Sequence, residues 1–177
     1  MMKSFAIESL SFGACGGSAV ALDLEDGLEF PAKRGSRRDM VSQHHVQITS
    51  DTDVVTARQL GREFAAEEGF SGGDQTVIAA AISEIARNIL NYAQTGEVTL
   101  HSAHEAERRG IVVVARDDGP GIPDVALALQ DGYTTSGGLG LGLPGSRRLM
   151  DEFSVVSSLG TGTLVTMKKW RRRGATK

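Results

Sequence analysis

The sequence SEIARNIL at residues 83–90 sets the architecture of this chain. It continues an apolar pattern that recurs at three- and four-residue steps from Ile78, which predicts a long central helix. Glu84 and Asn88 lie off that apolar stripe and four residues apart, so a carboxylate and an amide oxygen project from one face of the helix. Hard oxygen ligands suit Mg²⁺, which commonly takes only one or two of them from the protein. Taken alone, this spacing is much more typical of a solvated polar face.

Periodic segments on both sides of this helix predict an α/β fold. Ser50–Asp53 offers N-cap oxygens for a first helix, Gly69 ends it, and Asp74 can cap the central helix. We expect a strand at 44–49, helices at about 51–68 and 74–90, strands at 96–102 and 110–117, a loop at 119–141, a helix from about 142, and a hairpin at 154–158 and 163–170. This order places a layer of helices over one face of a mixed, mostly antiparallel sheet.

Composition limits the classes of protein to consider. The chain has 177 residues, 19 basic and 22 acidic side chains and a net charge of −3, which gives little support to nucleic-acid binding driven by charge. Its single Cys15 excludes an intrachain disulfide framework. We find no apolar run long enough for a membrane span and no signal-peptide pattern at the start, so we expect a cytoplasmic protein that binds neither membrane nor nucleic acid.

Three regions are expected from these patterns. Residues 1–40 lack sustained periodicity and form an N-terminal extension that is a flexible tail, a partner-binding arm or an artefact of start-site choice. Residues 41–172 form the folded domain, and 173–177 a basic tail. The basic segment 168–173, which contains one Trp, could contact RNA or an acidic partner, but a solvated terminal tail is the simpler interpretation.

Glycine-rich motifs follow the central helix. Asp117 begins the sequence DDGPG directly after an apolar strand, where its carboxylate could accept a hydrogen bond from an amine and the glycines let backbone approach a flat base; a plain turn is the alternative. Residues 137–144 alternate glycines ahead of a helix, which favours an anion site, with a flexible linker as the alternative. They match neither a P-loop nor a Rossmann motif. Residues 160–163, GTGT, are a tight turn or simply a plain hairpin.

In chain order, these four motifs resemble the N box and the three glycine boxes of the gyrase, Hsp90, histidine-kinase and MutL (GHKL) ATPases. More narrowly, SEIARNIL, DDGPGIPD, DGYTTSGGLGLGLPGSRRLMDEF and GTGT are similar to the serine/threonine switch kinases of the bacterial stressosome, the RsbT type. The likeness spans roughly residues 44 to 170. It implies the Bergerat fold, a two-layer α/β sandwich.

The resemblance also implies a role for each matching residue. Glu84 acts as general base, Asn88 binds Mg²⁺, Asp117 holds the adenine amine, Gly119 and Gly121 line the base, Gly138, Gly140 and Gly142 wrap the phosphates, and Gly162 and Thr163 support the adenine end. ATP and Mg²⁺ are then the expected cofactors. The implied partners are STAS-domain antagonist and scaffold proteins, phosphorylated on Ser or Thr, and a PP2C-type phosphatase that the released kinase activates. The alternative is an anti-sigma factor that sequesters a sigma factor.

Departures from related patterns narrow the subfamily. A sensor histidine kinase would carry a preceding helix with its phosphoacceptor His, but residues 1–40 contain no His, and Asn91 stands where those kinases place a Lys. Gyrase- and MutL-type hydrolases need a transducer domain, for which no chain remains. The segment 1–40 is not part of the switch-kinase pattern.

Overall fold

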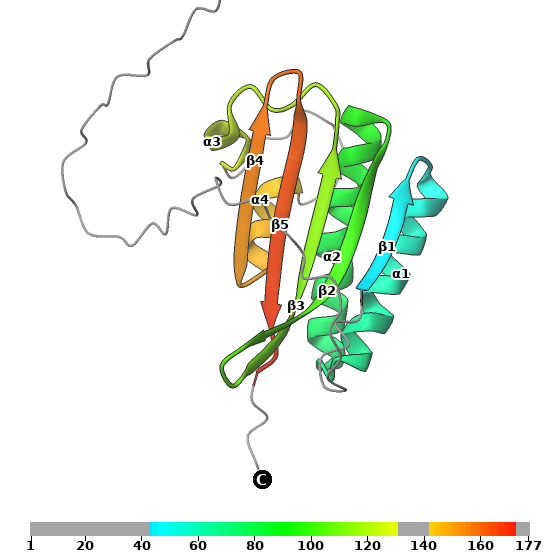
Figure 1. The fold of residues 1–177 in the computed structure, drawn as a ribbon, viewed down its shortest axis with the longest axis vertical. Coiled ribbons are helices and arrows are strands. Elements are labelled where there is room, and N and C mark those ends of the chain that lie inside the picture. The colour runs from blue at the N-terminus through cyan, green and yellow to red at the C-terminus, as the bar shows by residue number, and fades with distance from the viewer. Residues whose placement is uncertain (1–42, 131–141, 173–177) are drawn as a thin grey trace, which may run out of the picture. The chain divides into compact units, whose positions relative to one another are not determined.

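A five-stranded antiparallel sheet forms one layer of the protein (Figure 1). The computed structural model describes residues 43–130 and 142–172. The strands, in their order across the sheet, are β1 (Gln43–Ile48), β2 (Gly96–Glu105), β3 (Arg108–Asp117), β5 (Gly162–Trp170) and β4 (Glu152–Ser158). We expected a mixed sheet, but every pairing among these strands is antiparallel. Tight turns join β2 to β3 and β4 to β5, and such turns connect only antiparallel neighbours.

Helices form the second layer. They are α1 (Asp51–Glu67), α2 (Gly72–Asn88), the π-helical turn η1 (Ile89–Ala93), the short α3 (Val125–Ala128) and α4 (Gly142–Leu149). Figure 1 shows α1, α2 and α4 on the same face of the sheet. The expected two-layer α/β sandwich is therefore confirmed. Within the described residues, no helix is long and apolar enough to cross a membrane.

The helix starts illustrate how local hydrogen bonds set the element boundaries. As expected, the segment 50–53 supplies the N-cap of α1. The cap is Ser50, in a capping box in which its side chain and the Asp53 carboxylate satisfy each other's backbone N–H groups. The expectation that Asp74 caps α2 is wrong. Ser71 is the N-cap and its hydroxyl accepts from the Asp74 N–H at 3.1 Å, so the helix begins at Gly72. The acidic side chain instead lies in the first turn, where it complements the helix dipole.

The core lies between the two layers. Alternate residues of the strands point inward and meet the apolar face of α2, as strand and helix periodicity require. Fully buried members from the two layers are Ile48, Val98, Leu100, Ile111, Val113 and Met167 in the sheet, with Phe64, Ile78, Ile82 and Ile85 in the helices. This packing fixes the register of α2 against the sheet, and with it the direction in which the polar face of α2 points.

The end of β5 corrects the expectation of a solvated tail. Lys169 and Trp170 are both buried. The Lys169 ammonium lies 2.9 Å from the Asp151 carboxylate, which also accepts from the Trp170 backbone N–H at 2.7 Å. Burial alone would raise the pKa of Asp151, but these two hydrogen bonds and the charge of Lys169 outweigh it, and the pKa lies below its usual value. The expected extension at 1–40 and the tail at 173–177 fall outside the described residues.

Candidate functional site

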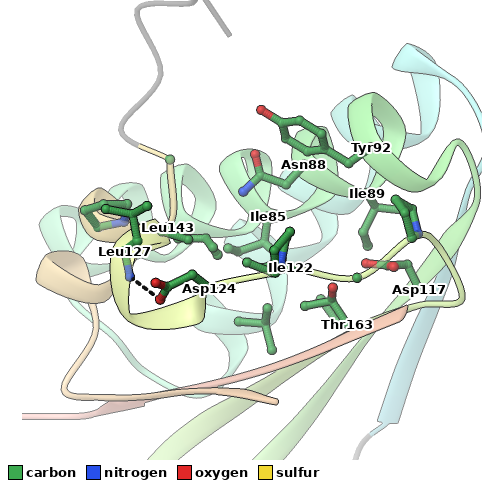
Figure 2. Close-up of a pocket in the computed structure, with 18 residues that line it drawn as sticks. Ile85, Asn88, Ile89, Tyr92, Asp117, Ile122, Asp124, Leu127, Leu143 and Thr163 are labelled. Atoms are coloured by element: carbon green, nitrogen blue, oxygen red, sulfur yellow. Dashed lines mark hydrogen bonds between the residues drawn. The ribbon is translucent and has the colours of Figure 1, made fainter. Parts of the chain in front are cut away.

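A cavity of about 440 Å³ opens at the end of the core, between the α2–η1 helix, the loop after β3, and the start of α4 (Figure 2). Its walls are mostly apolar, and its few polar side chains come from separate elements, Asn88 from α2, Asp117 from the end of β3 and Thr163 from β5. The lining residues that the following paragraphs use are Ile85, Asn88, Ile89, Tyr92, Asp117, Gly121, Ile122, Asp124, Leu127, Gly142, Leu143 and Thr163. Such a concave, apolar cavity with a few convergent polar groups is typical of a small-molecule site.

The central helix supplies one wall. Ile85, Asn88, Ile89 and Tyr92 line the cavity at spacings of three and four residues, which place them on one helix face. The helix changes to a π-turn directly after Asn88, a feature that is frequent at functional sites. We did not predict Tyr92, although its spacing from Asn88 would have indicated it.

The opposite side of the cavity holds a carboxylate and a hydroxyl. Asp117 ends β3 and lies opposite Thr163 of β5 in the strand register. The Asp117 Oδ1 accepts from the Gly119 backbone N–H at 3.0 Å, which fixes the orientation of the carboxylate. Figure 2 shows both side chains at this end of the cavity. A carboxylate held in this way is well placed to accept a hydrogen bond from a bound amine.

Two glycines let the surrounding loops approach closely. Gly121 has φ +74°, and a Cβ there would lie 2.2 Å from the Ser158 carbonyl oxygen. Gly162 has φ +94°, and a Cβ there would lie 2.0 Å from the Asp117 carbonyl oxygen. Glycine adopts these positive φ values at little cost. Any larger residue at either position would be strained and would clash with the neighbouring carbonyl oxygen. The loop after β3 is thus docked on the β4–β5 turn.

The glycines therefore differ in what they do. Among the described lining residues, Gly121 and Gly142 face the cavity, whereas Gly119 and Gly162 do not. Gly119 packs on the Ala93 Cβ and orients Asp117 through its N–H, so it acts on the Asp117 carboxylate without being among the lining residues. The expected contact of Gly119 with a base stays a prediction. Gly138 and Gly140 lie outside the described residues.

Glu84 lies one turn before Asn88 on α2 and is not among the described lining residues. Its Oε2 accepts from the Gly142 backbone N–H at 3.2 Å, at the first residue of α4. A carboxylate therefore stands at the helix start where we expected an anion to bind, and it contacts a residue that lines the cavity. This arrangement brings Glu84, Asn88 and Gly142 to the same end of the site.

Several lining residues had no signal in the sequence. Ile122, Leu127 and Leu143 form apolar walls, and Asp124 caps the short helix α3 by accepting from the Leu127 N–H at 2.8 Å. Ser157 lies behind Thr163, with their hydroxyl oxygens 3.0 Å apart. These positions come together only because segments far apart in the sequence pack against each other, so no local residue spacing indicates them.

The lining of the cavity can be compared with the ligands that the motifs imply, a nucleotide and Mg²⁺. Apolar walls and the acceptors of Asp117 and Thr163 fit a flat base that carries an amine. At the other end, the Asn88 amide oxygen is a suitable ligand for Mg²⁺, which takes its remaining ligands from water and phosphate. Within the described residues, no group of three His, Cys, Asp or Glu side chains could hold a metal ion. A metal here would therefore depend on the nucleotide for most of its coordination.

The chain is similar to known proteins in sequence and, more distantly, in structure. The family model described as "Histidine kinase-like ATPase domain" matches residues 49–169. The chain is 49% identical over 133 residues to the protein named "Serine/threonine-protein kinase RsbT" of Bacillus subtilis, covering 75% of this chain and 100% of that one. It is 27% identical over 136 residues to an "Anti-sigma F factor" of Bacillus licheniformis, covering 73% and 93%. A solved structure of the mycobacterial sensor histidine kinase MprB aligns with a TM-score of 0.45 and 16% identity, covering 75% and 100%.

Proposed function

Because the chain belongs to the histidine kinase-like ATPase domain family, we propose that it is an ATP-dependent serine/threonine protein kinase. Its substrates are STAS-domain antagonist or scaffold proteins of a cytoplasmic partner-switching pathway, the stressosome of the general stress response. After release from them, the kinase activates a PP2C-type phosphatase by binding it.

One observation carries this proposal. The cavity has Asp117 and Thr163 together on one side and Asn88 on the helix wall away from them, with Ile85, Ile89 and Ile122 among its apolar lining, and Gly142 also lines it. This polarity matches a nucleotide, which has a flat base with an amine at one end and charged phosphates at the other. The 49% identity to a protein named as a serine/threonine-protein kinase supports phosphoryl transfer as the reaction.

The residues at the base end bind and orient the nucleotide. Asp117 accepts a hydrogen bond from the exocyclic amine, and its second oxygen stays on the Gly119 N–H. Ile89 and Ile122 hold the ring by apolar contact and exclude water from it. Fixing the base in this way positions the phosphates at the far end of the cavity, and positioning supplies much of the catalysis in phosphoryl transfer.

The residues at the phosphate end manage charge and protons. The Asn88 amide oxygen would hold Mg²⁺, which when bound neutralises negative charge on the phosphates. The Glu84 carboxylate acts as general base and takes the proton of an incoming Ser or Thr hydroxyl. When Glu84 turns to that hydroxyl it leaves the Gly142 N–H, which then becomes available to a phosphate oxygen.

Mass spectrometry tests the proposal. Purified protein is incubated with Mg²⁺, ATP and purified STAS-domain proteins, and each partner is analysed for the mass of one added phosphate on Ser or Thr. At an ATP concentration near the wild-type Kd, we expect phosphate on a STAS-domain protein with the wild type and far less with Asp117→Asn. Equal transfer by the wild type and the variant would show that this cavity is not the kinase site.

A second function is favoured by the similarity to anti-sigma F factors. In that case the nucleotide site would control binding of a sigma factor. A pull-down from the native host distinguishes the two functions. Recovery of a sigma factor without any STAS-domain protein or phosphatase would reverse the order in which we place them.

A further inference from the structure

The Ser157 hydroxyl joins three segments behind the base end of the cavity. Ser157 lies on the inward side of β4 and is half-buried. Its Oγ accepts from the Ile122 backbone N–H at 2.8 Å and donates to the Gly162 carbonyl oxygen at 2.9 Å. It also lies 3.0 Å from the Thr163 Oγ1. One hydroxyl therefore connects the loop after β3, the β4–β5 turn and a residue that lines the cavity.

These partners assign the protons. A carbonyl oxygen can only accept, so the single proton of Ser157 points to Gly162. A backbone N–H can only donate, so Ile122 uses one lone pair of the Ser157 oxygen. When both of these bonds are made, the remaining lone pair of Ser157 can only accept, so the Thr163 hydroxyl is the donor in the bond between them.

This assignment changes what Thr163 offers to a ligand. With this assignment the Thr163 proton is used by Ser157, and Thr163, which lines the cavity, offers its oxygen there as an acceptor. Asp117, its neighbour across the strands, offers a carboxylate, which is also an acceptor. Both polar side chains at this end thus require a donor from the ligand. A bound base that presented a carbonyl oxygen there would meet two acceptors with no proton between them.

We propose that Ser157 is a positioning residue that determines base specificity, because it holds the Thr163 hydroxyl as an acceptor and so selects 6-amino over 6-oxo purine nucleotides. This inference rests on the proposed nucleotide site and adds the group that sets its selectivity. Without the Ser157 hydroxyl, Thr163 can rotate its proton into the cavity and donate to a 6-oxo group. Selectivity should then fall while the cavity walls remain.

The test compares ATP with inosine triphosphate, ITP, in which a carbonyl oxygen replaces the amine. Isothermal titration calorimetry gives both Kd values for the wild type, Ser157→Ala and Ser157→Thr. We expect the wild type to prefer ATP. In Ser157→Ala the ratio of the Kd for ITP to the Kd for ATP should fall by at least about fivefold, the size expected for one hydrogen bond. Ser157→Thr keeps the hydroxyl and should restore the preference. The matched control is Ser154→Ala, an exposed serine on the same strand, which should behave as the wild type.

The outcomes distinguish a failure of the specificity role from a failure of the proposed function. An unchanged ATP-to-ITP ratio in Ser157→Ala, or equal weakening of both nucleotides, overturns the specificity role. A wild type without any preference overturns it as well. A wild type that binds neither nucleotide refutes the proposed function itself. If Ser157→Ala fails to fold, Thr163→Val removes the second acceptor directly and should lower the ratio, and an unchanged ratio there also overturns the inference.

Discussion

The Asp117→Asn variant should lose ATP affinity without losing the fold. The asparagine oxygen can keep the hydrogen bond from the Gly119 N–H, which leaves its amide NH₂ facing the cavity. A donor then meets the exocyclic amine of adenine, and the charge-assisted hydrogen bond is lost. Such a bond contributes roughly 1.5–3 kcal/mol. At about 1.4 kcal/mol per tenfold change, we expect ATP to bind about 10- to 150-fold more weakly.

The adjacent carboxylate provides a matched control. Asp118 is exposed and pairs only loosely with Arg116, at 3.3 Å. Asp118→Asn makes the same chemical change one residue away and should leave the Kd within about twofold, because exposed ion pairs contribute little. Isothermal titration calorimetry measures the Kd, and circular dichroism checks that both variants fold. An unchanged Kd in Asp117→Asn, or equal losses in the two variants, would refute the assignment of Asp117 to the base.

Three further predictions concern the general base Glu84, the glycines of the β4–β5 turn, and the dependence of stability on pH. Glu84→Gln should bind ATP nearly as the wild type does, while phosphate transfer measured by mass spectrometry falls about 100- to 10,000-fold; unchanged transfer would exclude Glu84 as the base. Gly162→Ala should lower the unfolding free energy by about 3 kcal/mol or more in urea, because a Cβ would lie 2.0 Å from the Asp117 carbonyl oxygen. Gly160→Ala shares the positive φ but meets nothing within 4 Å, and should lose only about 1 kcal/mol; equal losses would contradict this reasoning. The pKa of Asp151 is lowered from 3.8, so the stability it contributes is present above about pH 4 and is lost as pH falls through its folded pKa. In urea unfolding, the free energy of unfolding of Asp151→Asn should therefore fall less steeply with decreasing pH than that of the wild type. An unchanged slope of this free energy against pH would contradict the prediction.

Elements that depend on local signals could be predicted from the sequence. The capping box at Ser50 and Asp53 and the apolar repeat of the central helix both involve residues within one or two turns of each other. The start of α2 was wrong because Ser71 and Asp74 are both good capping residues, and only the backbone conformation shows that Ser71 is the cap. Local chemistry thus identified the helices but left one boundary open between two candidate caps that lie three residues apart.

Features that depend on tertiary pairing could not be predicted. Trp170 belongs to a basic segment that resembles a tail, but it is buried because its backbone and ring nitrogens donate to Asp151 and Glu152. Ser157 bonds to Ile122, 35 residues away, and a serine in a strand gives no sign of that contact. The site shows the same division, since motifs indicated Asn88 and Asp117 but not the apolar walls or the hydroxyl behind them.

A crystal structure of the protein with Mg²⁺ and a non-hydrolysable ATP analogue would show directly how the nucleotide lies in the cavity. We expect the exocyclic amine to lie about 3 Å from a carboxylate oxygen of Asp117, and the Asn88 amide oxygen to coordinate the metal. A base bound away from Asp117, or a metal held without Asn88, would contradict this expectation.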